Sequence, residues 1–218
     1  MSALLGVALL VALGAAEGVG SDAARVPQGR EPLDAVAAVV ERRVVTLSEV
    51  EAEARLVLLD RAGADVAAGP LDAGLLQKVL DSVVLQELLA LEARRTGIAV
   101  REVDIDKSVE TVRARLGRDA ESARAFFQRF GVDEELLRSR ARRDLAAQAL
   151  LQKVFTEVKV TDEEAAALAA SSPASERSPA EGIAAARATL ERERRDVRFH
   201  ALIDAVRRST EVRVVWRP

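Results

Sequence analysis

The spacing of hydrophobic residues along the chain predicts a mainly α-helical protein. Between Asp72 and Thr96, leucine and valine recur at helical spacing, at about two apolar residues per turn. This apolar face is wider than one neighbouring helix can cover, so we expect the helix to be central or to present a groove. Asp72 is its predicted N-cap, and Gly97 suits the left-handed turn that ends a helix. The apolar face consists of Leu75, Leu76, Val79, Leu80, Val83, Val84, Leu88, Leu89 and Leu91.

Two capping boxes mark further helix starts. In this pattern a threonine side chain accepts a hydrogen bond from the third following N–H, and a glutamate at that position reaches back. Thr46 and Glu49 have this spacing and predict a helix that runs to Gly63. Thr161 and Glu164 repeat it and predict a short alanine-rich helix.

Four more helical segments follow from apolar periodicity, aspartate caps and terminal glycines. One follows Val100 and ends at Gly117, and the next is capped by Asp119 and ends at Gly131. A long helix runs from residue 133 to 155, and helical character returns over residues 183–208.

Strand-like segments occur only near the two ends of this helical region. Val36 to Val40 and Val44 to Thr46 are valine-rich runs separated by three charged residues, which predicts a short hairpin. Residues 211–216 alternate in the manner of a strand, and a single strand needs a partner. We therefore predict a mainly α fold in which the N-terminal hairpin and the C-terminal strand form one small sheet.

The N-terminal segment is predicted to be a secretory signal. Residues 3–16 are uncharged, and as a helix they would reach about 21 Å, short of the ~30 Å hydrocarbon core of a bilayer. The alternative is an apolar helix packed on the core, but such helices normally carry a polar stripe, which this run lacks. We expect residues 1–20 to be the signal, with no stable membrane insertion after its removal, and residues 21–34 to be a flexible lead-in.

Residues 171–182 have the composition of a linker, with two prolines and four serines. The predicted organisation is a helical core with its hairpin over residues 35–170, this linker, and a closing helix and strand of the same domain over residues 183–218. The sequence leaves open whether the sheet closes within a monomer or by a swap between two chains.

The composition excludes several kinds of chemistry. Among 218 residues there is no cysteine and no tyrosine, and there is one histidine, His200. Thiol nucleophiles, cysteine-ligated zinc and two-histidine metal motifs are therefore excluded. Asp196 and Asp204 lie one helical turn to either side of His200, but a lone helical histidine beside carboxylates is more often a solvated side chain. No glycine-rich phosphate-binding motif occurs, so we expect no catalytic residue, no metal and no cofactor.

The charge distribution does not favour a nucleic-acid partner. The chain has 32 basic and 35 acidic residues, a formal net charge of −3. Residues 183–218 are more basic, but only Phe199 and Trp216 could stack on bases there. Glu191 with Arg195 and Arg192 with Asp196 have the four-residue spacing of ion pairs on a solvated helix.

The order of these elements resembles the SurA family of periplasmic chaperones, whose N-terminal domain is related in plan to trigger factor. Arg138 and Arg142 have the four-residue arginine spacing of that family, whereas Arg101 replaces its usual capping residue. The resembling segments are AVAAVVERRVVTLSEVEAEARL (35–56), KVLDSVVLQELLALEARRTGI (78–98), LLRSRARRDLAAQALLQKV (136–154) with the preceding Phe127 and Gly131, and VKVTDEEAAAL (158–168).

This resemblance implies an ATP-independent periplasmic holdase that binds unfolded or extended polypeptides, in particular outer-membrane protein precursors. Longer members of the family carry parvulin isomerase domains after the Val-Thr-Asp-Glu segment, and the twelve residues of the linker are too few for one. The resemblance therefore implies a chaperone that is not an enzyme. The alternative is a non-catalytic adaptor that docks one specific folded periplasmic partner.

Two apolar surfaces are candidates for client binding. The first is the wide face of the helix from Asp72 to Thr96, because a contiguous exposed apolar patch marks an interaction site. The second is a phenylalanine group in which positions 126 and 130 share a face and Phe127 points elsewhere, so that at least one ring could contact a client. The predicted client-binding residues are Leu76, Leu80, Val83, Val84, Leu88, Phe126, Phe127 and Phe130.

Overall fold

The computed structural model describes residues 34–115, 120–171 and 178–217. Within these ranges, the residues from Ala35 onward form one compact unit. The predicted signal and nearly all of the lead-in lie outside the described residues, as do Gly117 and the predicted cap Asp119.

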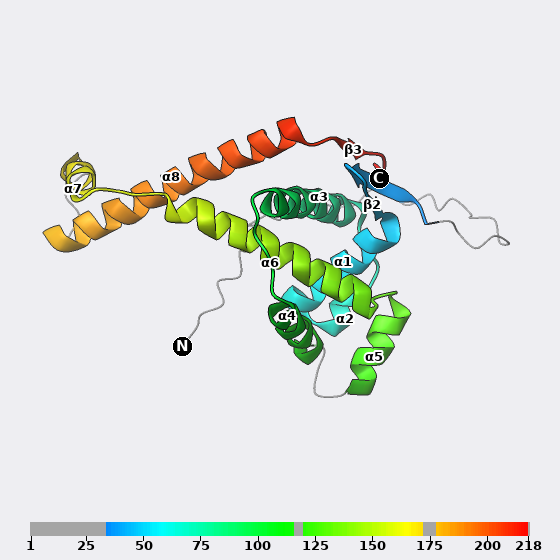
Figure 1. Cartoon of the computed structure of the whole chain (residues 1–218). Helices are drawn as coiled ribbons and strands as arrows, with labels where there is room; N and C mark the ends of the chain where they lie inside the picture. Colours follow the sequence, from blue (N-terminus) through cyan, green and yellow to red (C-terminus); the bar gives the residue numbers. More distant parts are fainter. Residues whose placement is uncertain (1–33, 116–119, 172–177, 218) are drawn as a thin grey trace. The chain divides into compact units, whose positions relative to one another are not determined.

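The fold is mainly helical with one small sheet, as predicted (Figure 1). In the described ranges, the N-terminal hairpin is followed by seven helices, then by the long helix α8 after residue 178, and then by a short strand. The elements are β1 (Val36–Val40), β2 (Arg43–Thr46), α1 (Leu47–Ala62), α2 (Ala64–Ala67), α3 (Ala73–Arg95), α4 (Glu102–Arg115), α5 (Ala120–Arg129), α6 (Glu134–Thr156), α7 (Asp162–Ser171), α8 (Pro179–Ser209) and β3 (Val212–Val214).

The capping residues chosen from the sequence begin α3, α6 and α7. Asp72 accepts a hydrogen bond from the Leu75 N–H at 3.0 Å, and Asp133 accepts one from the Leu136 N–H at 2.7 Å. At α7 both halves of the capping box form between Thr161 and Glu164, at 3.2 and 2.9 Å. These side chains satisfy backbone donors that a helix leaves unpaired in its first turn.

Two boundaries differ from prediction. The one-turn helix α2 was not predicted, because its four residues are too few for an apolar period. The closing helix also begins before residue 183, since Ser178 and Glu181 form a third capping box and α8 begins at Pro179. That proline favours the start of a helix, because its ring fixes φ and its missing N–H would be unpaired there.

The three strands form an antiparallel sheet in the order β2-β1-β3, which confirms the predicted pairing of the two ends. Val39 lies opposite Val44 on one side and Arg213 on the other. Arg95, at the end of α3, links the hairpin turn to the end of α8: it pairs with Glu41 and donates to the hydroxyls of Ser209 and Thr210.

The apolar face of α3 is buried in the first of the three hydrophobic clusters of the described chain. Residues from β1, β2, α1 and α8 pack against it, with Trp216 and Val212 at its margin. The sequence left open whether this helix is central or presents a groove, and the structure shows that it is central. The sequence shows how many apolar residues α3 carries, but it does not show that α8 and the small sheet pack over them. Buried in this cluster are Ala37, Ala38, Val40, Val45, Val50, Ala54, Leu76, Val79, Leu80, Val83, Val84, Leu88 and Val206.

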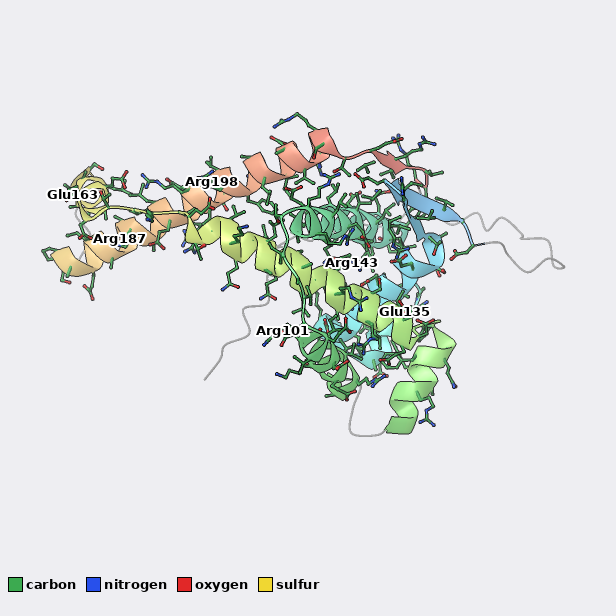
Figure 2. The ribbon with its side chains drawn as sticks, viewed as in Figure 1. Arg101, Glu135, Arg143, Glu163, Arg187 and Arg198 are labelled. Atoms are coloured by element: carbon green, nitrogen blue, oxygen red, sulfur yellow. The ribbon has the colours of Figure 1, made fainter. Side chains whose placement is uncertain are left out.

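A buried ion cluster joins α1, α3 and α6, which the sequence did not predict. Arg143 of α6, labelled in Figure 2, has a side chain that is only 3% exposed. It pairs with Glu53 of α1 and, at 3.2 Å, with Glu87 of α3. Glu49 of α1 lies 3.5 Å from the same guanidinium. The cluster is completed by Arg140, 3.3 Å from Glu53, and by Arg43, 2.6 Å from Glu49.

Arg143, Arg140 and the three glutamates lie largely away from solvent, whereas Arg43 is 43% exposed at the edge of the cluster. Arg140 also pairs with Asp144, at 3.6 Å. Burial lowers the pKa of Arg143, but the carboxylates of Glu53 and Glu87 outweigh it and hold that pKa above its ordinary value. The cluster also explains why the first capping box forms only in part. Thr46 accepts from the Glu49 N–H at 3.3 Å, but the Glu49 carboxylate bonds to Arg43.

We predict that Arg143→Met destabilises the protein by about 3–5 kcal/mol, because it leaves buried carboxylates without their cation. Arg142→Met is the matched control, since Arg142 is adjacent in sequence but 48% exposed, and among the described residues its ion pair is with Glu102. This control should cost less than about 1 kcal/mol. Urea unfolding followed by circular dichroism measures both values, and similar losses for the two variants would contradict this role of Arg143.

Candidate functional site

The structure places the five α3 residues predicted to bind clients inside the hydrophobic core. Leu80, Val83 and Leu88 are 0–2% exposed, and Leu76 and Val84 are 9% and 8% exposed. A client could contact them only if the sheet or α8 moved away. Client contact at these five residues stays a prediction that this arrangement does not support.

The three phenylalanines pack together at α5 and the turn that follows it. The ring centroids of Phe126 and Phe130 are 4.8 Å apart and those of Phe126 and Phe127 are 6.3 Å apart, both in edge-to-face geometry. Phe126 is buried, whereas Phe127 and Phe130 are half-buried against a second cluster formed by α1, α4 and α6. The guanidinium of Arg55 lies 3.9 Å from the Phe130 ring centroid and covers that ring. Client contact at these rings likewise remains a prediction.

An apolar groove open to solvent lies elsewhere, between the segment that follows α6 and the middle of α8. Its volume is about 470 Å³. Val158 and Leu190 form its apolar lining together with Val197, which at 69% has the largest exposed fraction of any large hydrophobic residue in the described chain. Charged side chains surround these three at the rim: Glu157, Lys159, Glu193, Arg194 and Arg198.

Arginines on one face of α8 bind the segment after α6, which lines the groove opposite α8 and forms the groove wall. Arg187 pairs with Asp162 and donates to the Val160 carbonyl at 2.7 Å. Arg194, seven residues later, makes two hydrogen bonds to Glu164, at 2.5 and 3.1 Å, and also donates to the Lys159 carbonyl. Figure 2 shows Arg187 and Arg198 along α8. The N-terminal part of α8, which includes Arg187, is packed against α7. The wall is therefore fixed mainly by ion pairs and carbonyl contacts.

The sequence analysis missed this groove, although a signal for it was present. Val197 is the one apolar residue in the otherwise charged stretch 191–198 of α8, and arginines at positions 187, 194 and 198 repeat with helical spacing. Only the pairing within α8 was considered. Glu191 and Arg195 do pair, at 3.5 Å, whereas no ion pair joins Arg192 and Asp196 in the part of the chain that is described.

The remaining polar candidates do not form a site. His200 is exposed, and its Nδ1 lies 2.7 Å from the Asp196 carbonyl oxygen, within its own helix. Over residues 34–115, 120–171 and 178–217, no group of three or more acidic or histidine side chains could hold a metal ion. No helix in these ranges is both long and apolar enough to cross a membrane.

The groove wall should respond to acid through Glu164. Its hydrogen bonds with Arg194 and with the Thr161 backbone lower the pKa of its carboxyl from 4.5 to about 2. Because the pKa is lowered on folding, this contact contributes fully above pH 4.5 and is lost as the pH falls through about 2. We predict that Arg194→Gln moves the NMR titration midpoint of Glu164 back towards 4.5. Arg195→Gln should leave it unchanged, and equal shifts in both variants would contradict the assignment.

Comparison with known proteins covers the hairpin and the helical core. Residues 33–151, more than half of the chain, match the family of the SurA N-terminal domain. The chain is 28% identical over 137 residues to the chaperone SurA of Pseudomonas syringae pv. tomato, covering 62% of this chain and 31% of that protein. It is 30% identical over 133 residues to that of Bordetella pertussis, covering 61% and 25%.

A longer match extends beyond the family segment. The chaperone SurA of Chromohalobacter salexigens is 28% identical over 163 residues, which are 74% of this chain and 35% of that protein. The chain thus spans about a third or less of the length of these relatives. The matched segment contains β1, β2, the buried ion cluster and most of α6. Sequence and fold agree, and the chain belongs to the SurA N-terminal domain family.

Proposed function

We propose that the protein is an ATP-independent periplasmic chaperone that holds unfolded or extended polypeptides, in particular precursors of outer-membrane proteins, without catalysing a reaction. Family membership supports the chaperone class, since the matched relatives are named as chaperones. The observation that carries the proposal is the solvent-open groove with Val158, Leu190 and Val197 in its lining. An exposed apolar hollow gives a client something to bury, which the sealed α3 face does not.

The proposed mechanism is burial of client side chains against the groove without a fixed hydrogen-bond register. Burial of apolar surface is non-directional, so segments of different sequence are accepted. Fully burying one valine or leucine contributes roughly 1.5–3 kcal/mol, and binding also has to offset the loss of motional freedom. A groove with three apolar residues therefore supports weak binding that a folding client can leave.

The rim charges fit the same mechanism. Arg194 is already paired with Glu164, and Arg198 lies 4.0 Å from Glu157, so neither requires a partner from the client. Such paired side chains surround the apolar lining without selecting a particular sequence.

The test is suppression of aggregation of an unfolded outer-membrane β-barrel protein by the purified chain. We expect wild-type protein to suppress aggregation and Val197→Asp to lose most of this effect, because a charge in the groove has to be desolvated when a client binds. Val103→Asp is the matched control, since Val103 is also a helical valine, 49% exposed, but lies on α4. This control should keep wild-type activity.

No suppression at a several-fold molar excess of wild-type protein would contradict the proposal. Repeating the assay with several unrelated unfolded proteins separates a holdase from an adaptor. A holdase retains most of them, whereas an adaptor for one folded partner retains none.

A further inference from the structure

Exposed valines gather at the small sheet. Seven large hydrophobic side chains are exposed in the described chain, and four of them belong to the strands or to the residue after β3. Val214 and Val215, at the β3 edge, are 37% and 56% exposed. Consecutive strand residues point to opposite faces, so each face of this edge offers one apolar side chain.

The outer edge of β3 also presents backbone hydrogen-bonding groups. Glu41 N–H bonds to the Glu211 carbonyl, and Val215 N–H bonds to the Ala37 carbonyl, both at 2.9 Å. In an antiparallel pair such bonding alternates along the strand, so the N–H and C=O groups of Val212 and Val214 point away from β1. These outward groups have no protein partner among the described residues.

The opposite edge of the sheet is different, because a side chain covers it. On β2 the Nη1 of Arg43 donates to the carbonyl of Val44, at 2.5 Å. Side-chain cover is one means by which proteins prevent strand addition at an edge. Among the described residues no side chain bonds to the outward groups of Val212 and Val214. The edge of β3 therefore remains able to pair as far as Val214, after which the N–H groups of Val215 and Trp216 both bond to the Ala37 carbonyl.

The charge around β3 specifies the partner further. Residues 207–217 contain four arginines and one glutamate, and Glu211 lies 3.4 Å from Arg213. A strand that carries acidic residues at its polar positions complements this charge, whereas one that carries lysine is repelled. Backbone groups that recur every second residue match an extended chain and no other conformation.

We propose that the outer edge of β3 binds client polypeptides by strand addition, and that it favours extended segments in which apolar residues alternate with acidic ones. The client adds a fourth strand next to β3, bonds to the outward groups of Val212 and Val214, and covers Val214 and Val215. This deepens the proposed function, on which it rests, by giving the holdase a second contact that reads backbone conformation.

Amide hydrogen exchange tests the proposal directly on the wild-type protein. The probe is a short peptide with blocked ends in which valine alternates with glutamate. At a peptide concentration about ten times its Kd, exchange at the Val212 and Val214 amides should slow about tenfold, because only the free fraction exchanges. The Val215 amide already bonds to β1 and should not change. Trp216, the one tryptophan of the chain, gives an independent fluorescence signal next to the strand.

Two variants separate the backbone contact from the side chain. Val214→Pro removes an outward N–H that makes no bond to β1, and it should weaken peptide binding at least about tenfold. Val214→Thr keeps the N–H and the β-branched shape, and it should bind within about threefold of wild type. Protection of the Val215 amide shows whether the sheet stays intact in Val214→Pro.

The peptide's charge and the client assay complete the test. A valine–lysine peptide should bind several-fold more weakly, and high salt should reduce this difference. Absence of peptide binding, or binding with unchanged exchange at Val212 and Val214, would overturn the edge proposal. If aggregation is still suppressed in that case, the proposed function stands without it. If the amides respond but no client is kept soluble, the chaperone function fails and the edge site remains.

Discussion

The arrangement of the helical core depends on the buried ion cluster around Arg143. Its guanidinium contacts carboxylates of α1 and α3, so a single side chain from α6 fixes three helices. Apolar contacts between helices tolerate small rotations and shifts, because dispersion forces are not directional. A buried, hydrogen-bonded ion pair does not tolerate such shifts, because a displaced partner leaves an unpaired charge without water, which costs free energy. The cluster therefore selects one packing of α1, α3 and α6, and with it the positions of the elements that carry the sheet and α8.

Much of the fold follows from local rules that the sequence makes visible. Capping at Asp72, Asp133 and Thr161 involves residues three positions apart, so it can be read without knowledge of tertiary structure. The pairing of the two ends follows from the rule that a lone strand needs a partner. Glu49 shows the limit of such rules, because its carboxylate was assigned to a local cap and instead joins charges from distant elements.

The candidate site was much harder to predict than the fold. The number of apolar residues singled out α3, but a helix of the core and a helix at an interaction surface can both be rich in apolar residues. The tertiary contacts of α3 with β1, β3 and α8 decide between the two, and the sequence does not show those contacts. The groove at Val197 has few apolar residues, and Val197 itself lies in a charged stretch of α8, so the local composition did not reveal the groove. The signal for Arg143 was the presence of Glu87 within an otherwise apolar face of α3, since a buried acid requires a buried base.

The sheet has a consequence for the order in which the domain can form. Its middle strand lies near the beginning of the helical unit, and one of its neighbours comes from the last residues of the sequence. During synthesis from the N-terminus, the hairpin and α3 precede their final neighbours by more than a hundred residues. Until then β1 lacks its second partner and α3 lacks the cover from α8. Closure is a late, long-range event of the kind that slows folding, and a nascent molecule is for that interval itself a polypeptide with exposed apolar surface.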